Sequence, residues 1–191
     1  MVVAITVAIA FVSAFRPAGA ATGARSCDAD RGRVLVLTKT GRITSVPDVE
    51  GVRWWYACSH RNGRRVGLGF DEPDPLGTEH LSHPRLAGSY AAVAEYLRST
   101  LTPGPDAILV DLNSRRRWEM PVPGDVDGMV LSQRGHLVVA NHDSVLHLRR
   151  GGARATLDSG DIGGNSLAVS RDGRYVYWQN AEQPRVFELP R

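Results

Sequence analysis

Two segments in the last third of the chain repeat one pattern at an offset of 38 residues. Residues 131–140 read LSQRGHLVVA, and residues 169–178 read VSRDGRYVYW. Each predicts a strand, a Ser-x-x-Gly turn and a second strand, because a Ser side chain bonds nearby backbone amides and Gly tolerates a positive φ. A period near 40 residues built from short strands is typical of the blades of a β-propeller.

The repeat makes a specific structural prediction. Gly135 and Gly173 should occupy equivalent hairpin turns of successive sheets. A sheet this small cannot bury its apolar face alone, so we expect a neighbouring copy to cover it. The two sheets should therefore pack face to face, with Val139 and Tyr177 buried.

The rest of the chain also reads mostly as short strands separated by turn residues. Asn62-Gly63, for example, favours a tight hairpin, because both central positions of its turn need a positive φ. Residues 71–84 contain three prolines and lack periodicity, which predicts a surface loop. Residues 86–97 fit either an amphipathic helix or a strand at 90–96, and their spacing favours neither. The candidate blades are 32–70, 86–122, 126–158 and 164–189.

The second copy of the repeat, residues 167–178, resembles a blade of WD40-like or TolB-like β-propellers. The layout of residues 27–191 is also similar to that of small uncharacterised secreted proteins of high-GC actinobacteria. The segments that carry this similarity are 56–59, 63–65, 86–90, 157–160 and 166–167. The resemblance implies a strand at 90–96 and brings no catalytic residues with it.

We therefore expect one all-β domain over residues 21–191. Its fold would be a small or incomplete propeller-like array of about four antiparallel blades. The alternative fold is a β-sandwich with one helix near 86–97.

The first 20 residues predict an export signal. Residues 2–12 are almost wholly apolar, and Ala18-Gly19-Ala20 matches the small-residue pattern that precedes a cleavage site. The mature chain should begin at or near Ala21 and be secreted or otherwise extracytoplasmic, without a membrane span after cleavage. An uncleaved membrane anchor is the alternative, although the apolar run is short for a span.

The sequence contains two cysteines, Cys27 and Cys58. In an exported chain an even cysteine count predicts a disulfide. The bridge would tie the start of the mature chain to the first group of strands, where a free end would otherwise fray.

Arginines cluster beside the predicted turns. If the turns gather at the ends of the blades, these residues could form one basic binding rim. The alternative is that they keep edge strands soluble and unpaired. The net charge is only +3 and the acids are interspersed, so we expect no nucleic-acid partner. The candidate rim residues are Arg61, Arg64, Arg65, Arg115, Arg116 and Arg117.

No segment carries a recognisable catalytic or cofactor motif, so we assign no catalytic residue, metal ligand or cofactor. His80 and His83 have a chelating spacing but no third ligand nearby in the sequence. We expect a non-enzymatic recognition or scaffold domain that binds a protein or a cell-envelope component through its blade loops. The alternative is an exported hydrolase, acting on a glycan, whose acids and histidines would converge in a pocket.

Overall fold

A computed structural model describes residue 27 and residues 32–72, 79–97 and 105–191, which form four antiparallel sheets. The first sheet contains β1 (Arg33–Leu37), β2 (Gly41–Pro47), β3 (Arg53–Ser59) and β4 (Arg65–Asp71). The second contains β5 (Glu79–Ala87), β6 (Tyr90–Leu97), β7 (Asp106–Asp111) and β8 (Arg117–Pro121). The third contains β9 (Gly128–Leu131), β10 (His136–Ala140), β11 (Ser144–Arg149) and β12 (Arg154–Ser159). The fourth contains β13 (Ala168–Val169), β14 (Tyr175–Asn180) and β15 (Gln183–Glu188), preceded by the 3-10 turn η2 (Gly164–Ser166).

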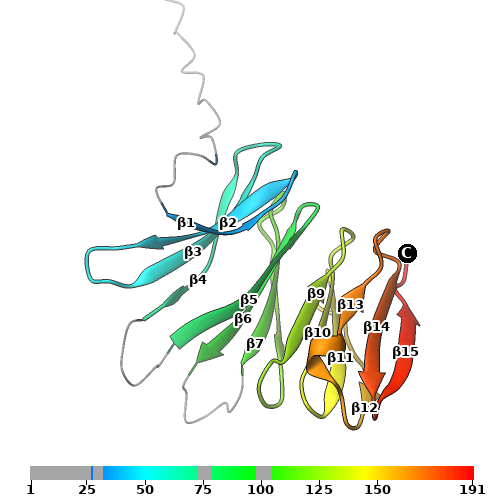
Figure 1. Cartoon of the computed structure of the whole chain (residues 1–191). Helices are drawn as coiled ribbons and strands as arrows, with labels where there is room; N and C mark the ends of the chain where they lie inside the picture. The colour runs from blue at the N-terminus through cyan, green and yellow to red at the C-terminus, as the bar shows by residue number, and fades with distance from the viewer. Residues whose placement is uncertain (1–26, 28–31, 73–78, 98–104) are drawn as a thin grey trace, which may run out of the picture.

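The strands of every sheet pair in the order of the chain, so each sheet is a meander of hairpins. The four sheets stand in a row from the first to the fourth (Figure 1). This arrangement confirms the prediction of an all-β fold built from four small antiparallel units. In the described residues no helix is long and apolar enough to cross a membrane.

Hydrophobic side chains fill each space between neighbouring sheets. Successive side chains of a strand point to opposite faces, so the two middle sheets bury both of theirs. In β6, Val93 belongs to the core shared with the first sheet and Ala92 to the core shared with the third. In β10, Val139 faces the second sheet and Val138 the fourth. The middle strands are therefore apolar at consecutive positions.

The turns of the repeat confirm the predicted equivalence. Gly135 lies between β9 and β10 with φ 79°, and Gly173 lies between β13 and β14 with φ 69°. Each glycine amide donates to the backbone carbonyl of the serine three residues earlier, at 3.1 Å and 2.9 Å. The hydroxyls of Ser132 and Ser170 accept amides farther along their turns. The two hairpins share these turn contacts but close differently, because the Ser132 amide donates to the His136 carbonyl whereas the Ser170 amide donates one residue later, to the Tyr175 carbonyl.

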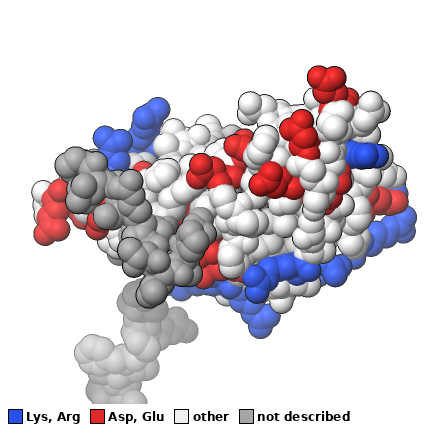
Figure 2. Space-filling view, turned by 90° about the horizontal axis from the view of Figure 1, so that it is seen from below, with Lys and Arg blue, Asp and Glu red and all other residues white. Residues whose placement is uncertain are grey.

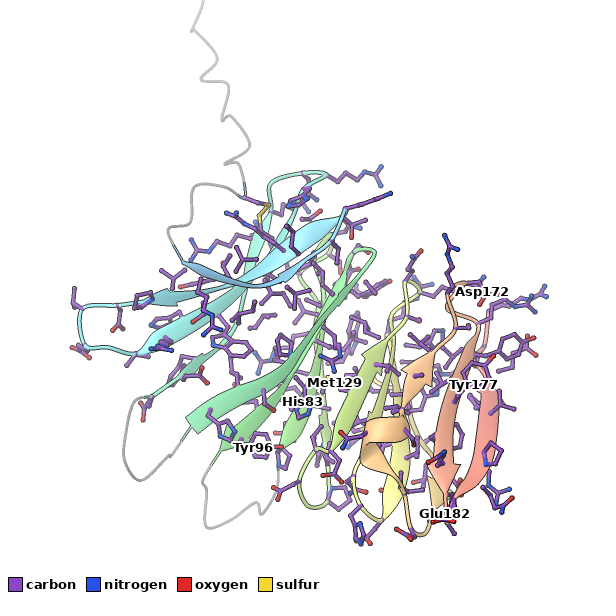
Figure 3. All side chains as sticks on the ribbon, in the orientation of Figure 1. His83, Tyr96, Met129, Asp172, Tyr177 and Glu182 are labelled. Atoms are coloured by element: carbon purple, nitrogen blue, oxygen red, sulfur yellow. A yellow bond between two sulfur atoms is a disulfide. The ribbon has the colours of Figure 1, made fainter. Side chains whose placement is uncertain are left out.

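The predicted burial was correct for Val139 and wrong for Tyr177. Val139 is fully buried, whereas Tyr177 is 44% exposed and lies on the last sheet of the row (Figure 3). The two residues align in the repeat but take opposite faces, because Leu131 pairs with Leu137 in the third sheet whereas Val169 pairs with Val176 in the fourth, a shift of one residue. Tyr177 therefore points away from the third sheet, and among the described residues no further sheet covers that face. The fourth sheet instead packs its other face, with Val176 and Trp178, against the third.

The predicted loop at residues 71–84 was partly wrong, because β5 begins at Glu79. Its pairing with β6 shifts register between Ser82 and Arg85, and His83 in this bulge has φ 52°. A bulge lets the strand accommodate Pro84, which cannot donate to the ladder. The helix near 86–97 is also wrong, since these residues complete β5 and form β6.

A disulfide joins Cys27 to Cys58 of β3, with the two Cα atoms 5.8 Å apart. This bond confirms the pairing expected from the sequence and is consistent with an extracytoplasmic protein. The predicted signal segment, residues 1–20, lies outside the described residues.

Candidate anion-binding rim

The hairpin turns at the upper end of the sheets in Figure 1 carry an almost purely basic set of charges. We call this end the basic rim; it comprises segments 38–40, 60–64, 88–89, 112–116, 132–135, 150–153, 170–174 and 189–191. Asp172 is the acid among these segments. Their basic residues are Lys39, Arg61, Arg64, Arg115, Arg116, Arg134, Arg150, Arg171, Arg174 and Arg191.

The opposite end, which we call the acidic rim, has the reverse character. Among the described connections there, every Lys, Arg, Asp or Glu residue is an acid. These residues are Asp48, Glu50, Glu72, Asp125, Asp127, Asp143, Asp161 and Glu182. Figure 2 views this end and shows red carboxylates across it, with blue side chains mainly along the edges. In the fourth sheet, Asp172 and Glu182 mark the two ends (Figure 3).

Two adjoining pockets open at the basic rim and share Ser89. The first-sheet pocket has a volume of about 530 Å³ and is lined by Lys39, Thr40, Ser59, His60, Arg61, Gly88, Ser89 and Asn113. The third-sheet pocket has a volume of about 570 Å³ and is lined by Ser89, Tyr90, Gln133, Arg134, His136, Arg149, Arg150, Ala153 and Arg191. Neither lining includes an Asp or Glu residue. Both pockets therefore favour an anion over a cation.

The structure brings the turns that carry the two groups of predicted rim arginines, 61–65 and 115–117, into contact. Arg64, in the turn between β3 and β4, donates to the carbonyl of Asn113, in the turn between β7 and β8. The side chain of Asn62 also donates to the Asn113 side chain at 3.3 Å. Arg61 lines the first-sheet pocket. Arg115 and Arg116 are exposed in the same β7–β8 turn as Asn113.

Two of the six predicted rim residues point elsewhere. The guanidinium of Arg65 lies over the ring of Tyr56, 3.4 Å from its centroid. Arg117 forms ion pairs with Glu95 at 3.0 Å and with Glu119 at 2.6 Å. These contacts tie both side chains to strands, so we do not include them in the rim.

The sequence analysis missed the third-sheet pocket. Arg134 and Arg150 come from two turns, β9–β10 and β11–β12, that strand pairing places side by side. The Arg150 amide donates to the Gly135 carbonyl at 3.2 Å and so joins the turns. Arg134 sits between the Ser and Gly of the repeat, at a position where the second copy has Asp172. The one signal in the sequence was a basic residue in a tight turn, and a basic turn residue alone does not indicate a pocket.

His136, which lines the third-sheet pocket, belongs to a buried histidine pair. Nδ1 of His136 and Nε2 of His147 are 3.0 Å apart, and both residues are buried. Burial, together with the charges of the neighbouring His136 and Arg149, lowers the pKa of His147 to about 4. Burial is also the main cause of the lowered pKa of His136, with a contribution from Arg149. At neutral pH both rings are therefore uncharged.

The histidines with chelating spacing are engaged separately. His80 stacks on Tyr96, with ring centroids 4.3 Å apart, and Nδ1 of His83 lies 2.8 Å from the hydroxyl of Ser82. Over the part of the chain that is described, no group of three His, Cys, Asp or Glu residues is placed to hold a metal ion.

No protein-family model matches the sequence, and none of the curated proteins matches it. Its function is therefore inferred from the geometry and charge of the rim.

Proposed function

We propose that the protein is an extracytoplasmic, non-enzymatic binding domain that holds an anionic protein or cell-envelope component against its basic rim. The observation that carries this proposal is the separation of charge between the two ends of the sheets. A net charge of +3 would give a weak field if it were spread evenly. Among the described turns the cations share one end and the acids, Asp172 apart, the other, so the field orients an anionic partner toward the basic rim.

The backbone of the rim supports a binding role. Tight hairpins between paired strands hold the charged turns, so the arginines project from a rigid base. The cross-turn contact of Arg64 with Asn113 joins the first sheet to the second at this end. A rigid, multivalent cationic surface loses little conformational freedom when it binds a polyanion.

The extracytoplasmic location belongs to the same proposal. It rests on the disulfide between Cys27 and Cys58 and on the signal-like residues 1–20 of the sequence. We also propose that the four sheets are blades of an open propeller-like array, as their meander order and repeated turns suggest.

The rival hydrolase has less support. A glycan hydrolase of the common kind needs two carboxyl groups on either side of the scissile bond. The linings of the two rim pockets contain histidines but no Asp or Glu. Recognition of an anion, by contrast, needs only the basic and neutral polar side chains that line these two pockets.

Two triple variants with the same net charge test the proposal. The rim variant replaces Arg61, Arg115 and Arg116 with Gln, and the control variant replaces Arg33, Arg53 and Arg185 with Gln. All six residues are exposed, and the control residues lie in strands away from the basic rim. Both proteins are loaded on immobilised heparin, a sulfated glycan, and eluted with a salt gradient.

We expect the rim variant to elute at clearly lower salt than the wild type, because each lost contact removes one released counterion. The control variant should elute close to the wild type. Equal shifts for the two variants would show that only net charge matters, and the proposal would fail.

A further inference from the structure

The third-sheet pocket concentrates positive charge more than the rest of the basic rim. Arg134, Arg149 and Arg150 all line it, together with Arg191. None of the ion pairs found among the described residues involves the first three arginines. These exposed guanidinium groups give the pocket a positive potential that favours an anion bound among them.

Local contacts hold the walls of this pocket in place. The Ser132 hydroxyl accepts the Arg134 amide at 3.3 Å, which fixes the β9–β10 turn. A Cβ atom added to Gly135 would lie 2.7 Å from the ring of Tyr90, so this turn rests directly on the second sheet. Nη1 of Arg150 lies 3.5 Å from the Tyr90 hydroxyl. The backbone that carries the arginines is therefore set before a ligand arrives.

The number of arginines favours one class of anion. A carboxylate carries one charge and is satisfied by one bidentate arginine. A phosphate monoester carries about −1.5 to −2 charges and three strong acceptor oxygens, so it can engage several guanidinium groups at once. Ser89 and Gln133 add neutral hydrogen-bonding groups at the edge. The volume of about 570 Å³ leaves room for the molecule that carries the phosphate.

We propose that the third-sheet pocket binds a phosphate group through Arg134, Arg149 and Arg150. This inference deepens the proposed function, on which it rests, by naming the chemical group that one part of the basic rim recognises. His136, the partner of His147, adds an uncharged ring to the lining of the site. A bound phosphate offsets the arginine charges that contribute to the lowered pKa of His136.

The test uses the oxidised protein and two probes, inorganic phosphate and glucose 6-phosphate, with glucose as the uncharged control. Binding is followed by calorimetry and by shifts of backbone amide NMR signals. The site variant carries Arg134→Gln and Arg150→Gln. The matched control carries Arg33→Gln and Arg53→Gln, which removes the same charge from exposed strand residues outside this pocket and outside the basic rim.

We expect both phosphates to bind the wild type and to shift amide signals of residues 133–136 and 149–150, while glucose does neither. The site variant should bind at least about tenfold more weakly, since each lost charged hydrogen bond is worth about a factor of ten. The control variant should keep wild-type affinity for phosphate. Tighter binding of glucose 6-phosphate than of inorganic phosphate would assign the site to phosphosugars, and equal binding would assign it to free phosphate.

Two results would overturn the site. One is the absence of phosphate binding at millimolar concentration, and the other is equal weakening in the two double variants. Neither result depends on retention by heparin, which the triple variants measure with other arginines. A protein that holds heparin through its rim but does not bind phosphate would therefore refute this site alone.

Discussion

The buried histidine pair makes the stability of the fold depend on pH. The pKa of His147 is about 4 in the folded protein and about 6.5 in an unfolded chain. Since the folded pKa is lowered, the unfolded state takes up a proton first as the pH falls. The stability that neutral His147 provides is complete above pH ~6.5 and is lost progressively toward pH ~4.

The magnitude follows from these two pKa values. Between pH ~7.5 and pH ~5, His147 alone should remove about 2 kcal/mol from the free energy of unfolding. Residual solvation of the ring reduces this to about 1–2 kcal/mol. His136, whose pKa is lowered as well, adds a loss of the same sign.

Urea unfolding of the wild type and of His147→Gln at both pH values measures the effect. Gln cannot titrate, yet it retains a side-chain amide that can bond His136. The free energy of unfolding should fall by about 1–2 kcal/mol more in the wild type than in the variant. If the two proteins lose the same stability on acidification, His147 is not held neutral by the fold and the argument fails.

Three further perturbations test the packing of the sheets, each measured by urea unfolding. Gly135→Ala and Gly173→Ala both place a side chain at positive φ, which should lower the free energy of unfolding by about 1–2 kcal/mol. Gly135→Ala should cost about 1–3 kcal/mol more than Gly173→Ala, because its Cβ meets the Tyr90 ring at 2.7 Å. Equal losses would contradict this contact. Val139→Ala should cost about 2–3 kcal/mol and Tyr177→Ala less than about 1 kcal/mol, and the reverse order would contradict the assigned faces. Reduction of the disulfide, whose cysteines are 31 residues apart, should cost about 3–4 kcal/mol, and unchanged stability would show that the bond does not constrain the unfolded chain.

Local rules were sufficient for the hairpins and the disulfide. The turn chemistry of Ser132 and Gly135 depends on residues within four positions of each other, so it could be predicted and then recognised again at Ser170 and Gly173. The pairing of Cys27 with Cys58 followed from the count of cysteines. The alternation of Leu137 with Val139 likewise fixed which side chains share a face of the sheet.

The sequence did not determine which face of the last sheet is covered. Tyr177 and Val139 are equivalent in the repeat, and the pattern gave both an apolar face. The face that each residue takes depends on strand register: Leu131 pairs with Leu137 in the third sheet, whereas Val169 pairs with Val176 in the fourth. This shift of one residue directs Tyr177 away from the third sheet, to a face without a neighbouring sheet in the described structure, while Val139 packs against the second sheet.

The basic rim shows the same division between local and tertiary information. The sequence shows which turns carry basic or acidic residues. In an antiparallel meander, successive turns lie at opposite ends of the sheet. Assigning each turn to an end therefore requires the correct number of strands before it. The sequence analysis missed β5, because the bulge at His83 and Pro84 interrupts the alternation of its side chains. When one strand is missing from the count, every later turn is assigned to the wrong end of its sheet. The sequence by itself determined the hairpins and the charges of their turns. Only the tertiary structure decided that the basic turns lie at one end and line pockets there, because that arrangement depends on the path of the whole chain.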